Sequence, residues 1–406
     1  MPASAPIVIV GASLTGAKAA ESLRAEGFAG PITLIGEDPE PPYERPPLSK
    51  EYLQGKSERE KVFVQADGFY REQDIELRAG TTVSSIDPVR HEVVLEDGER
   101  LPYAQLLVAT GSSPRRLAVP GADLDGVLYL RTLADCDALA DALEHSDSLV
   151  VIGAGWIGSE VTASARQLGV SVTMIDPADL PLQHVLGDEV GAIYRDLHRS
   201  HGVDLRLDVG VDSLRGADRV DEVDLTDGTR IPAEVVVVGV GALPRVELAA
   251  AAGLTVDNGI VVDANLHANL PDVFAAGDVA SAFHPLYHTH LRVEHWANAL
   301  NQGLAVGKNL AGVPTPYDRV PYFYSDQYDL SMEYSGYATT WDRVVFRGNP
   351  DDGEFVAFWM KGRRVLAGMN ANVWDVLDPI QHLIRERIEV DDDTLADTDI
   401  PLGSLG

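Results

Sequence analysis

Cysteine is almost absent from this sequence, since Cys136 is the only one among 406 residues. A single thiol cannot form an intramolecular disulfide, a CxxC redox pair or a cysteine-built metal site. Positive charge is also scarce: 32 Lys and Arg stand against 63 Asp and Glu, for a formal net charge of −31. Nucleic acids and anionic membranes bind clustered Lys and Arg, so neither is expected as a partner.

Long apolar runs are missing as well. No segment reaches the roughly 18 uninterrupted apolar residues that a membrane span requires. The first residues, MPASAPIVIVGAS, contain no basic region followed by a long apolar stretch, so we expect no targeting segment and a cytoplasmic protein. Four histidines (His284, His288, His290 and His295) lie close in sequence, but no carboxylate or cysteine pattern accompanies them. We therefore predict no metal site.

The length favours two or three domains, and a composition of 45% hydrophobic and 23% charged residues is typical of a globular protein. The chain opens with an expected strand at Ile7–Val10, a glycine turn, a helix at about 16–26 and a second strand at about 32–35, and the same order returns near Leu149. This repetition predicts an α/β fold with two Rossmann-like dinucleotide-binding domains. After Pro321 the chain becomes aromatic and strand-like, with a helix expected near Asp378–Arg387, which indicates a separate α+β domain.

The first glycine turn nearly matches the fingerprint G-x-G-x-x-G, with Gly11, Ser13 and Gly16 at its three positions. Such a turn lets backbone amides and a helix N-terminus approach a pyrophosphate. Ser13 is small, but its Cβ reduces the space. Glu37 follows the second strand, where a carboxylate usually binds the adenosine ribose. The alternative is a glycine turn needed only for close helix packing.

The second turn matches the fingerprint fully, with Gly153, Gly155 and Gly158. Asp176 follows the second strand of this copy, where it is expected to bond the ribose hydroxyls of NADH and to repel a 2′-phosphate. The next residues, PADLPLQHV, contain no arginine that would hold such a phosphate. We therefore expect NADH to be preferred over NADPH.

Seven further blocks occur in a characteristic order: PYERPPLSK, ATG, YLRT, GWIGSE, AAGD, VEHWANA and SDQY. Together they resemble the putidaredoxin reductase-like ferredoxin reductases of bacterial oxygenase systems, which are related to apoptosis-inducing factor. The resemblance implies a fold of the glutathione-reductase type. It also implies a discontinuous FAD-binding domain at 1–113 and 243–320, a NAD-binding domain at 114–242 and a C-terminal reductase domain at 321–406.

The resemblance implies that Lys50, Glu160 and Trp296 are the catalytic group. Lys50 would lie beside the flavin, Glu160 would reach the nicotinamide carboxamide, and Trp296 would lie near both rings. Asp278 would bind a ribitol hydroxyl of FAD, with a following helix directed at the pyrophosphate. The alternatives are a solvated surface lysine, an exposed carboxylate at a helix N-terminus, a core tryptophan and a helix-capping aspartate.

The other cofactor contacts that the resemblance implies come from several segments. They are Thr15, Arg45, Val83, Ala109, Gly111, Arg131 and Gly277 for FAD, and Ile157 and Gly241 for NADH. The sequence departs from the family in three places: Ser13 replaces a glycine of the first turn, Arg245 replaces a frequent Asn after GALP, and His288 and His290 occupy a stretch that is commonly arginine-rich.

Disulfide reductases of this fold carry a cysteine pair just after the first strand–helix–strand unit, where this chain has PYERPPLSK. Without that pair the reduced flavin must pass its electrons directly to an external acceptor. We expect hydride transfer from NADH to FAD, then single electrons to a [2Fe-2S] ferredoxin serving a cytochrome P450 or ring-hydroxylating dioxygenase. The alternatives are an NADH oxidase or quinone reductase, and a redox-sensing interaction protein. Candidates for a basic docking rim are Arg71, Arg292, Lys308, Arg385 and Arg387.

Overall fold

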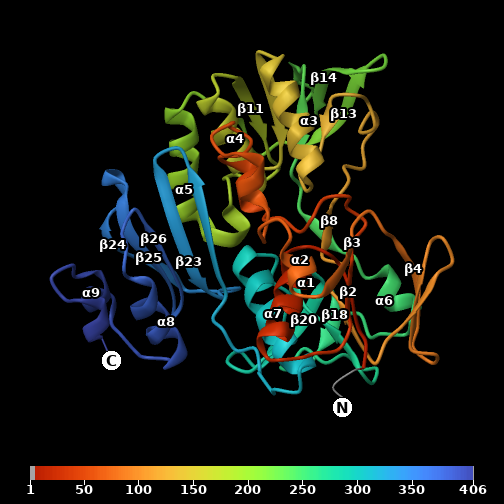
Figure 1. Cartoon of the computed structure of the whole chain (residues 1–406). Helices are drawn as coiled ribbons and strands as arrows, with labels where there is room; N and C mark the ends of the chain where they lie inside the picture. Colours follow the sequence, from red (N-terminus) through yellow and green to blue (C-terminus); the bar gives the residue numbers. More distant parts are fainter. Residues whose placement is uncertain (1–4, 406) are drawn as a thin grey trace. The chain divides into compact units, whose positions relative to one another are not determined.

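The computed structural model describes residues 5–405, which form two compact units (Figure 1). Unit 1 contains the described residues through Glu44, Arg59–Ser113 and Leu243–Pro321. Unit 2 contains Arg45–Glu58, Pro114–Ala242 and the described chain from Tyr322 onward. Residues 45–58, which the sequence assigns to the FAD-binding domain, thus pack with unit 2. The division into three domains stays a prediction.

Unit 1 is built on a five-stranded parallel sheet in the order β19-β7-β1-β2-β3. Its strands are β1 (Ile7–Val10), β2 (Ile32–Ile35), β3 (Ile75–Arg78), β7 (Gln105–Val108) and β19 (Val273–Ala275). All four residues of β1 are buried, as expected for the centre of a parallel sheet covered on both faces. The predicted bounds of β1 and β2 are confirmed.

Two helices of unit 1, α1 (Leu14–Ala25) and α7 (Trp296–Leu310), lie against each other (Figure 1). Side chains on α1 bond backbone carbonyls of α7: Thr15 Oγ1 donates to Ala299 O at 3.1 Å, and Ser22 Oγ donates to Leu304 O at 2.8 Å. These bonds satisfy buried hydroxyls and fix α1 behind the first glycine turn.

Smaller elements complete unit 1. They are η2 (Arg59–Val62), α2 (Phe69–Glu72), β4 (Val83–Asp87), β5 (Glu92–Leu95), β6 (Arg100–Pro102), α6 (Glu247–Ala251), β18 (Ile260–Val262), η3 (Gly277–Val279), β20 (Ala280–His284) and β21 (Thr289–Leu291). Strands β4, β5 and β6 form an antiparallel sheet, and β18, β20 and β21 form another three-stranded sheet. The short β8 (Ser112–Pro114) and β17 (Ala242–Pro244) lie where the chain passes between the units.

Unit 2 repeats the same architecture in a parallel sheet of order β12-β11-β10-β16-β9. Its strands are β9 (Val127–Leu128), β10 (Ser148–Ile152), β11 (Ser171–Ile175), β12 (Asp204–Arg206) and β16 (Val236–Val238). Its helices are η1 (Pro46–Ser49), α3 (Leu133–Glu144), α4 (Trp156–Gln167) and α5 (Gln183–Ser200). A separate antiparallel sheet contains β13 (Val211–Gly216), β14 (Val220–Leu225) and β15 (Arg230–Pro232).

The C-terminal part of unit 2 is an antiparallel sheet of order β22-β23-β26-β25-β24. Its elements are β22 (Tyr322–Gln327), β23 (Leu330–Gly336), β24 (Arg343–Asn349), η4 (Pro350–Asp352), β25 (Glu354–Lys361), β26 (Arg364–Ala371), α8 (Leu377–Arg385), α9 (Asp392–Ala396) and η5 (Leu402–Ser404). The indole of Trp359 is fully buried and donates to Leu186 O on α5 at 3.0 Å. The C-terminal sheet and α5 therefore share one hydrophobic core. Within residues 5–405, no helix combines the length and apolarity needed to cross a bilayer.

Candidate functional site

The first glycine turn connects β1 to α1 and is closed tightly by the backbone. Gly11 N donates to Ile35 O at 2.7 Å, and Ser13 is the extended N-cap of α1. A Cβ added at Gly16 would overlap the carbonyl oxygen of Gly11, so this position has no room for a side chain. The geometry fits the pyrophosphate of a dinucleotide, because the turn and the N-terminus of α1 present backbone amides together.

Asp278 is brought to the end of β7, beside the ATG segment. Ser112 Oγ donates to Asp278 Oδ2 at 3.0 Å, and Gly277 N donates to the buried Gln302 side chain at 2.8 Å. The helix expected after Asp278 is wrong: a 3-10 turn, η3, is followed directly by β20. Residues from Ala280 pair with β18, and this sheet pairing prevails over helix formation.

Glu37 lies just beyond β2, as predicted, and its carboxylate is engaged by Arg245. The guanidinium contacts both carboxylate oxygens, with Nη2 to Oε2 at 2.7 Å. The hydrogen bond from Arg245 holds the pKa of Glu37 below its usual value, against an opposing effect of burial. Both side chains remain substantially exposed, so the pair contributes at most about 1 kcal/mol. Glu37, which is predicted to bind the ribose of FAD, is therefore already hydrogen-bonded to Arg245.

Trp296 is the first residue of α7, and His295 is its N-cap. Burial lowers the pKa of His295 to about 4, and Asp278 opposes that shift. His295, one residue before the predicted catalytic tryptophan, therefore interacts electrostatically with Asp278. Val83 lies on β4 opposite Leu95 and is partly buried against the core of unit 1, so its adenine contact stays a prediction.

The second glycine turn, in unit 2, has the same construction as the first. Gly153 N donates to Ile175 O at 2.8 Å, and a Cβ added at Gly158 would overlap the carbonyl oxygen of Gly153. Asp176 lies against this turn: its Oδ2 accepts from Ala154 N at 2.6 Å and its Oδ1 from Ala178 N at 2.8 Å. The turn and Asp176, which is predicted to bind the ribose, are therefore joined directly by hydrogen bonds.

Two predicted contacts of the nicotinamide nucleotide lie close to the carboxyl ends of the strands of this sheet. Ile157, in the first turn of α4, is 44% exposed, and Gly241 follows β16. Arg206 is a neighbour that the sequence analysis missed, because it lies on β12, far along the chain from Asp176. Its carbonyl accepts from Asp176 N at 3.0 Å, while its guanidinium pairs with Asp204 at 2.9 Å.

Lys50 and Glu160 form a buried ion pair in unit 2. Lys50 Nζ lies 3.1 Å from Glu160 Oε2, and the two residues are 8% and 5% exposed. The alternatives of a solvated surface lysine and an exposed carboxylate are therefore wrong. Two serines complete the cluster: Ser49 Oγ also donates to Oε2, and Ser325 Oγ donates to Oε1 at 2.7 Å. Ser49 lies in the PYERPPLSK block and Ser325 in the SDQY block, but neither serine has a predicted role.

The predicted FAD contacts Arg45 and Arg131 also belong to unit 2, where Arg45 Nε donates to Arg131 O at 3.2 Å. Cys136, on α3, donates through Sγ to Leu48 O at 3.1 Å. Burial, followed by nearby Asp137 and Asp135, raises the pKa of this thiol to about 12. Since the thiolate is the reactive form, burial makes Cys136 a weak nucleophile in the folded protein.

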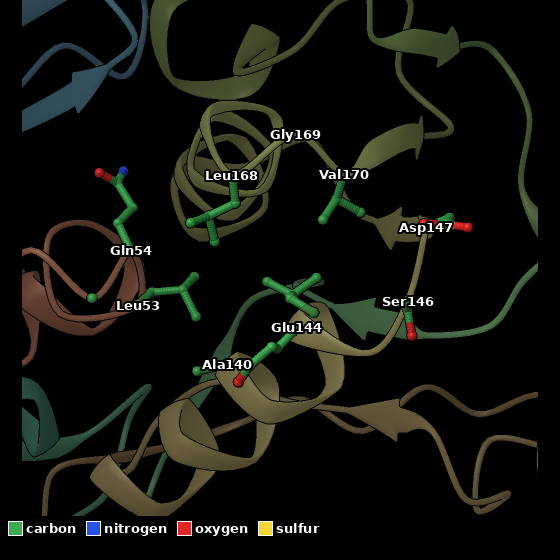
Figure 2. A pocket seen from close by; sticks show the side chains of 11 residues that line it. Leu53, Gln54, Ala140, Glu144, Ser146, Asp147, Leu168, Gly169 and Val170 are labelled. Carbon is green, nitrogen blue, oxygen red and sulfur yellow. The ribbon is translucent and has the colours of Figure 1, made fainter.

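A cavity of about 530 Å³ in unit 2 lies apart from these residues, and none of the predicted cofactor contacts lines it. Figure 2 shows Leu53, Leu168 and Val170 directed toward the hollow. Its complete lining is Leu53, Gln54, Gly55, Ala140, Leu143, Glu144, Ser146, Asp147, Leu168, Gly169 and Val170. Throughout residues 5–405, no group of three or more His, Cys, Asp or Glu side chains is placed to hold a metal ion.

Two protein families together match nearly the whole chain. Residues 5–303 match the pyridine nucleotide-disulphide oxidoreductase family, and residues 322–406 match the reductase C-terminal family. Putidaredoxin reductase of Pseudomonas putida is 38% identical over 411 residues, covering 100% of this chain and 97% of that protein. The ferredoxin–NAD(+) reductase component of the anthranilate 1,2-dioxygenase system of Burkholderia cepacia is 41% identical over 401 residues, covering 98% of each.

Among solved structures, a chain of the covalent putidaredoxin reductase–putidaredoxin complex superposes with a TM-score of 0.95 at 37% identity. The match covers 99% of this chain and 98% of that chain. Together with the family matches, it confirms the predicted fold class, in which pyridine-nucleotide oxidoreductase domains are followed by an α+β C-terminal domain.

Proposed function

This chain belongs to the pyridine nucleotide-disulphide oxidoreductase family, and on that premise we propose that it is an FAD-dependent NADH:ferredoxin oxidoreductase. The resemblance predicted from the sequence is confirmed, and with it the class of enzyme, a flavin- and nicotinamide-dependent oxidoreductase. The acceptor we propose is a [2Fe-2S] ferredoxin that serves a cytochrome P450 or a dioxygenase. We propose that the protein is cytoplasmic.

The observation that carries this proposal is a pair of dinucleotide turns in a chain with a single, buried cysteine. An internal disulfide cannot take electrons from the flavin, so they must leave the protein to an outside acceptor. One relative aligned over 98% of each chain is named as the ferredoxin–NAD(+) reductase component of a dioxygenase system, and another is named as a putidaredoxin reductase, which favours a ferredoxin as that acceptor. An NADH oxidase or quinone reductase would use the same turns and remains the alternative.

When bound, FAD would supply the conversion of a two-electron hydride donor into a source of single electrons. The first turn and Asp278 are the residues we propose to hold it, together with Arg45, Lys50 and Arg131. The other proposed residues position NADH. The turn at Gly158 would bind the pyrophosphate of NADH, Asp176 its ribose, and Glu160 its carboxamide. Alignment of this kind lowers the barrier by proximity and requires no proton-transfer group.

We expect NADH-driven cytochrome c reduction to rise at least about tenfold when a cognate [2Fe-2S] ferredoxin is added. The measurement is steady-state turnover with and without the ferredoxin, with a soluble quinone as the competing acceptor. Fast quinone turnover that no ferredoxin accelerates would favour the quinone reductase. Absence of turnover with every one-electron acceptor would favour a redox-sensing interaction protein.

The salt dependence of the electron-transfer rate shows how the ferredoxin docks. Ferredoxins are usually acidic, and this chain has a formal net charge of −31, so the two proteins repel each other at long range. If local basic residues steer docking, the second-order rate falls as salt is added; if net repulsion dominates, it rises. Arg292 is a poor member of the suggested rim, since its side chain is 11% exposed and pairs with Glu294. Lys308 is more exposed, with its Nζ lying 3.8 Å from a carboxylate oxygen of Glu26.

We expect NADH to reduce the flavin at least about tenfold faster than NADPH, measured as second-order constants by stopped flow. The carboxylate of Asp176 repels a 2′-phosphate, and the neighbouring Arg206 is already paired with Asp204. Asp176→Asn should reduce the ratio of the second-order constant for NADH to that for NADPH. Asp179→Asn, which changes an exposed carboxylate of the same loop, should leave it unchanged. Equal constants for the two coenzymes in the unmodified protein would contradict the prediction.

A further inference from the structure

One buried carboxylate in unit 2 gathers hydrogen bonds from segments far apart in the sequence. Glu160, on α4, accepts from Ser49 and Lys50 of the η1 segment and from Ser325 of β22. All four residues are nearly inaccessible, with exposed fractions of 2% for Ser49, 8% for Lys50, 5% for Glu160 and 1% for Ser325. A buried ion pair is costly unless further hydrogen bonds satisfy it, and the two serines supply them.

The two oxygens of Glu160 have different partners. Lys50 and Ser49 both donate to Oε2, whereas Ser325 donates to Oε1. A serine hydroxyl carries one hydrogen, and Gln327 Nε2 donates to Ser325 Oγ at 3.3 Å. The single hydrogen of Ser325 is therefore committed to Glu160.

Ser325 is itself held in place by the strand that carries it. Phe323, two residues earlier on β22, packs edge to face on Trp156 at the start of α4, with ring centroids 4.8 Å apart. Tyr324 lies with its ring centroid 5.3 Å from Lys50 Nζ. Strand β22 thus packs against α4, the helix that carries Glu160, and lies near Lys50, and these contacts hold Ser325 beside Glu160.

We propose that Ser325 is a positioning residue: its hydrogen bond to Oε1 sets the plane of the Glu160 carboxylate, so that the C-terminal strand β22 takes part in binding the nicotinamide nucleotide. The terminal torsion of a glutamate is broad, so bonds at one oxygen leave the other free to turn. Bonds at both oxygens remove that freedom. This inference rests on the proposed function, in which Glu160 orients the carboxamide of NADH.

The test compares Ser325→Ala with Ser325→Thr, which keeps a hydroxyl, and with Ser335→Ala, which removes a fully buried serine from β23 of the same sheet. The full-length, FAD-loaded protein is used throughout. We expect Ser325→Ala to lower the limiting rate of flavin reduction by NADH about tenfold and to weaken NAD+ binding, measured by calorimetry, severalfold. FAD content should stay close to that of the unmodified protein, and Tm should fall by only a few degrees, because Oε1 of Glu160 loses a buried donor. Ser325→Thr should recover most of the loss, and Ser335→Ala should show none.

Glu160→Gln separates the inference from the proposed function. If Glu160→Gln is impaired and adding Ser325→Ala costs nothing further, the two residues act as one unit, as proposed. If Glu160→Gln is impaired but Ser325→Ala matches the unmodified protein in rate and NAD+ affinity, the inference fails while the proposed function stands. If Glu160→Gln changes neither quantity, the role of Glu160 in the proposed function fails as well. Equal losses in Ser325→Ala and Ser325→Thr would also overturn the inference, since packing would then explain both.

Discussion

A Gly158→Ala variant is expected to lose at least about a hundredfold in the rate constant for flavin reduction by NADH at low coenzyme concentration, while keeping its FAD. The added Cβ would overlap the carbonyl oxygen of Gly153 and approach Val151, so the turn must open. Opening moves the amides away from the pyrophosphate, and a hundredfold loss corresponds to about 2.8 kcal/mol. Stopped-flow reduction gives the rate constant, and the flavin absorbance gives the FAD content.

Gly155→Ala is the matched control within the same turn. Gly155 is the N-cap of α4 in an extended conformation with φ −79°, and apart from its chain neighbours no atom of the described residues lies within 4 Å of an added Cβ, which would therefore crowd the nucleotide without opening the turn. The corresponding N-cap of α1 is Ser13, which already carries a Cβ at that position. Gly155→Ala should therefore lose much less than Gly158→Ala. Comparable losses in the two variants would show that the close approach to Gly153 is not what the turn requires.

The second large effect is expected from Gly16→Ala, which should be purified largely without flavin. Its Cβ would overlap the carbonyl oxygen of Gly11 and approach Leu34, the same conflict in the first turn. We expect FAD affinity to fall at least about a hundredfold, for the same reason as in Gly158→Ala. Fluorescence titration of the apoprotein with FAD measures this affinity.

Two comparisons keep the Gly16 result interpretable. Ser13→Gly, which restores the fingerprint, should retain full flavin content. Thermal melting shows whether Gly16→Ala is folded, because Gly16 is buried next to the core of unit 1. A folded Gly16→Ala protein with one FAD per chain would refute the placement of the flavin at this turn.

The parts of the fold that the sequence predicts correctly depend on short stretches of chain. The bounds of β1 and β2 follow from apolar runs that end in turns, and both glycine turns follow from spacing over a few residues. The helix expected after Asp278 fails because pairing with β18, a distant strand, decides the conformation there. The local pattern of apolar and polar residues does not predict pairing with a distant strand.

The same distinction holds for the candidate site. The resemblance pointed to Lys50 and Glu160, but not to Ser325, which comes from another part of the chain and joins them only in the folded structure. Arg206 reaches Asp176 through strand order, and Arg245 reaches Glu37 through the approach of two distant loops. Each of these partners depends on long-range geometry, which one sequence does not provide.

The single thiol has a practical consequence. Cys136 is fully buried, and its Sγ bonds the carbonyl of Leu48, two residues before Lys50. A maleimide reagent can react only after this contact opens, because it needs an accessible thiolate. The rate of labelling would therefore report how often the η1 segment opens away from α3, averaged over all molecules, and no second cysteine contributes to the signal. Cys136 is thus a natural labelling site that reports motion of the segment next to Lys50, the lysine that we propose to lie at the flavin.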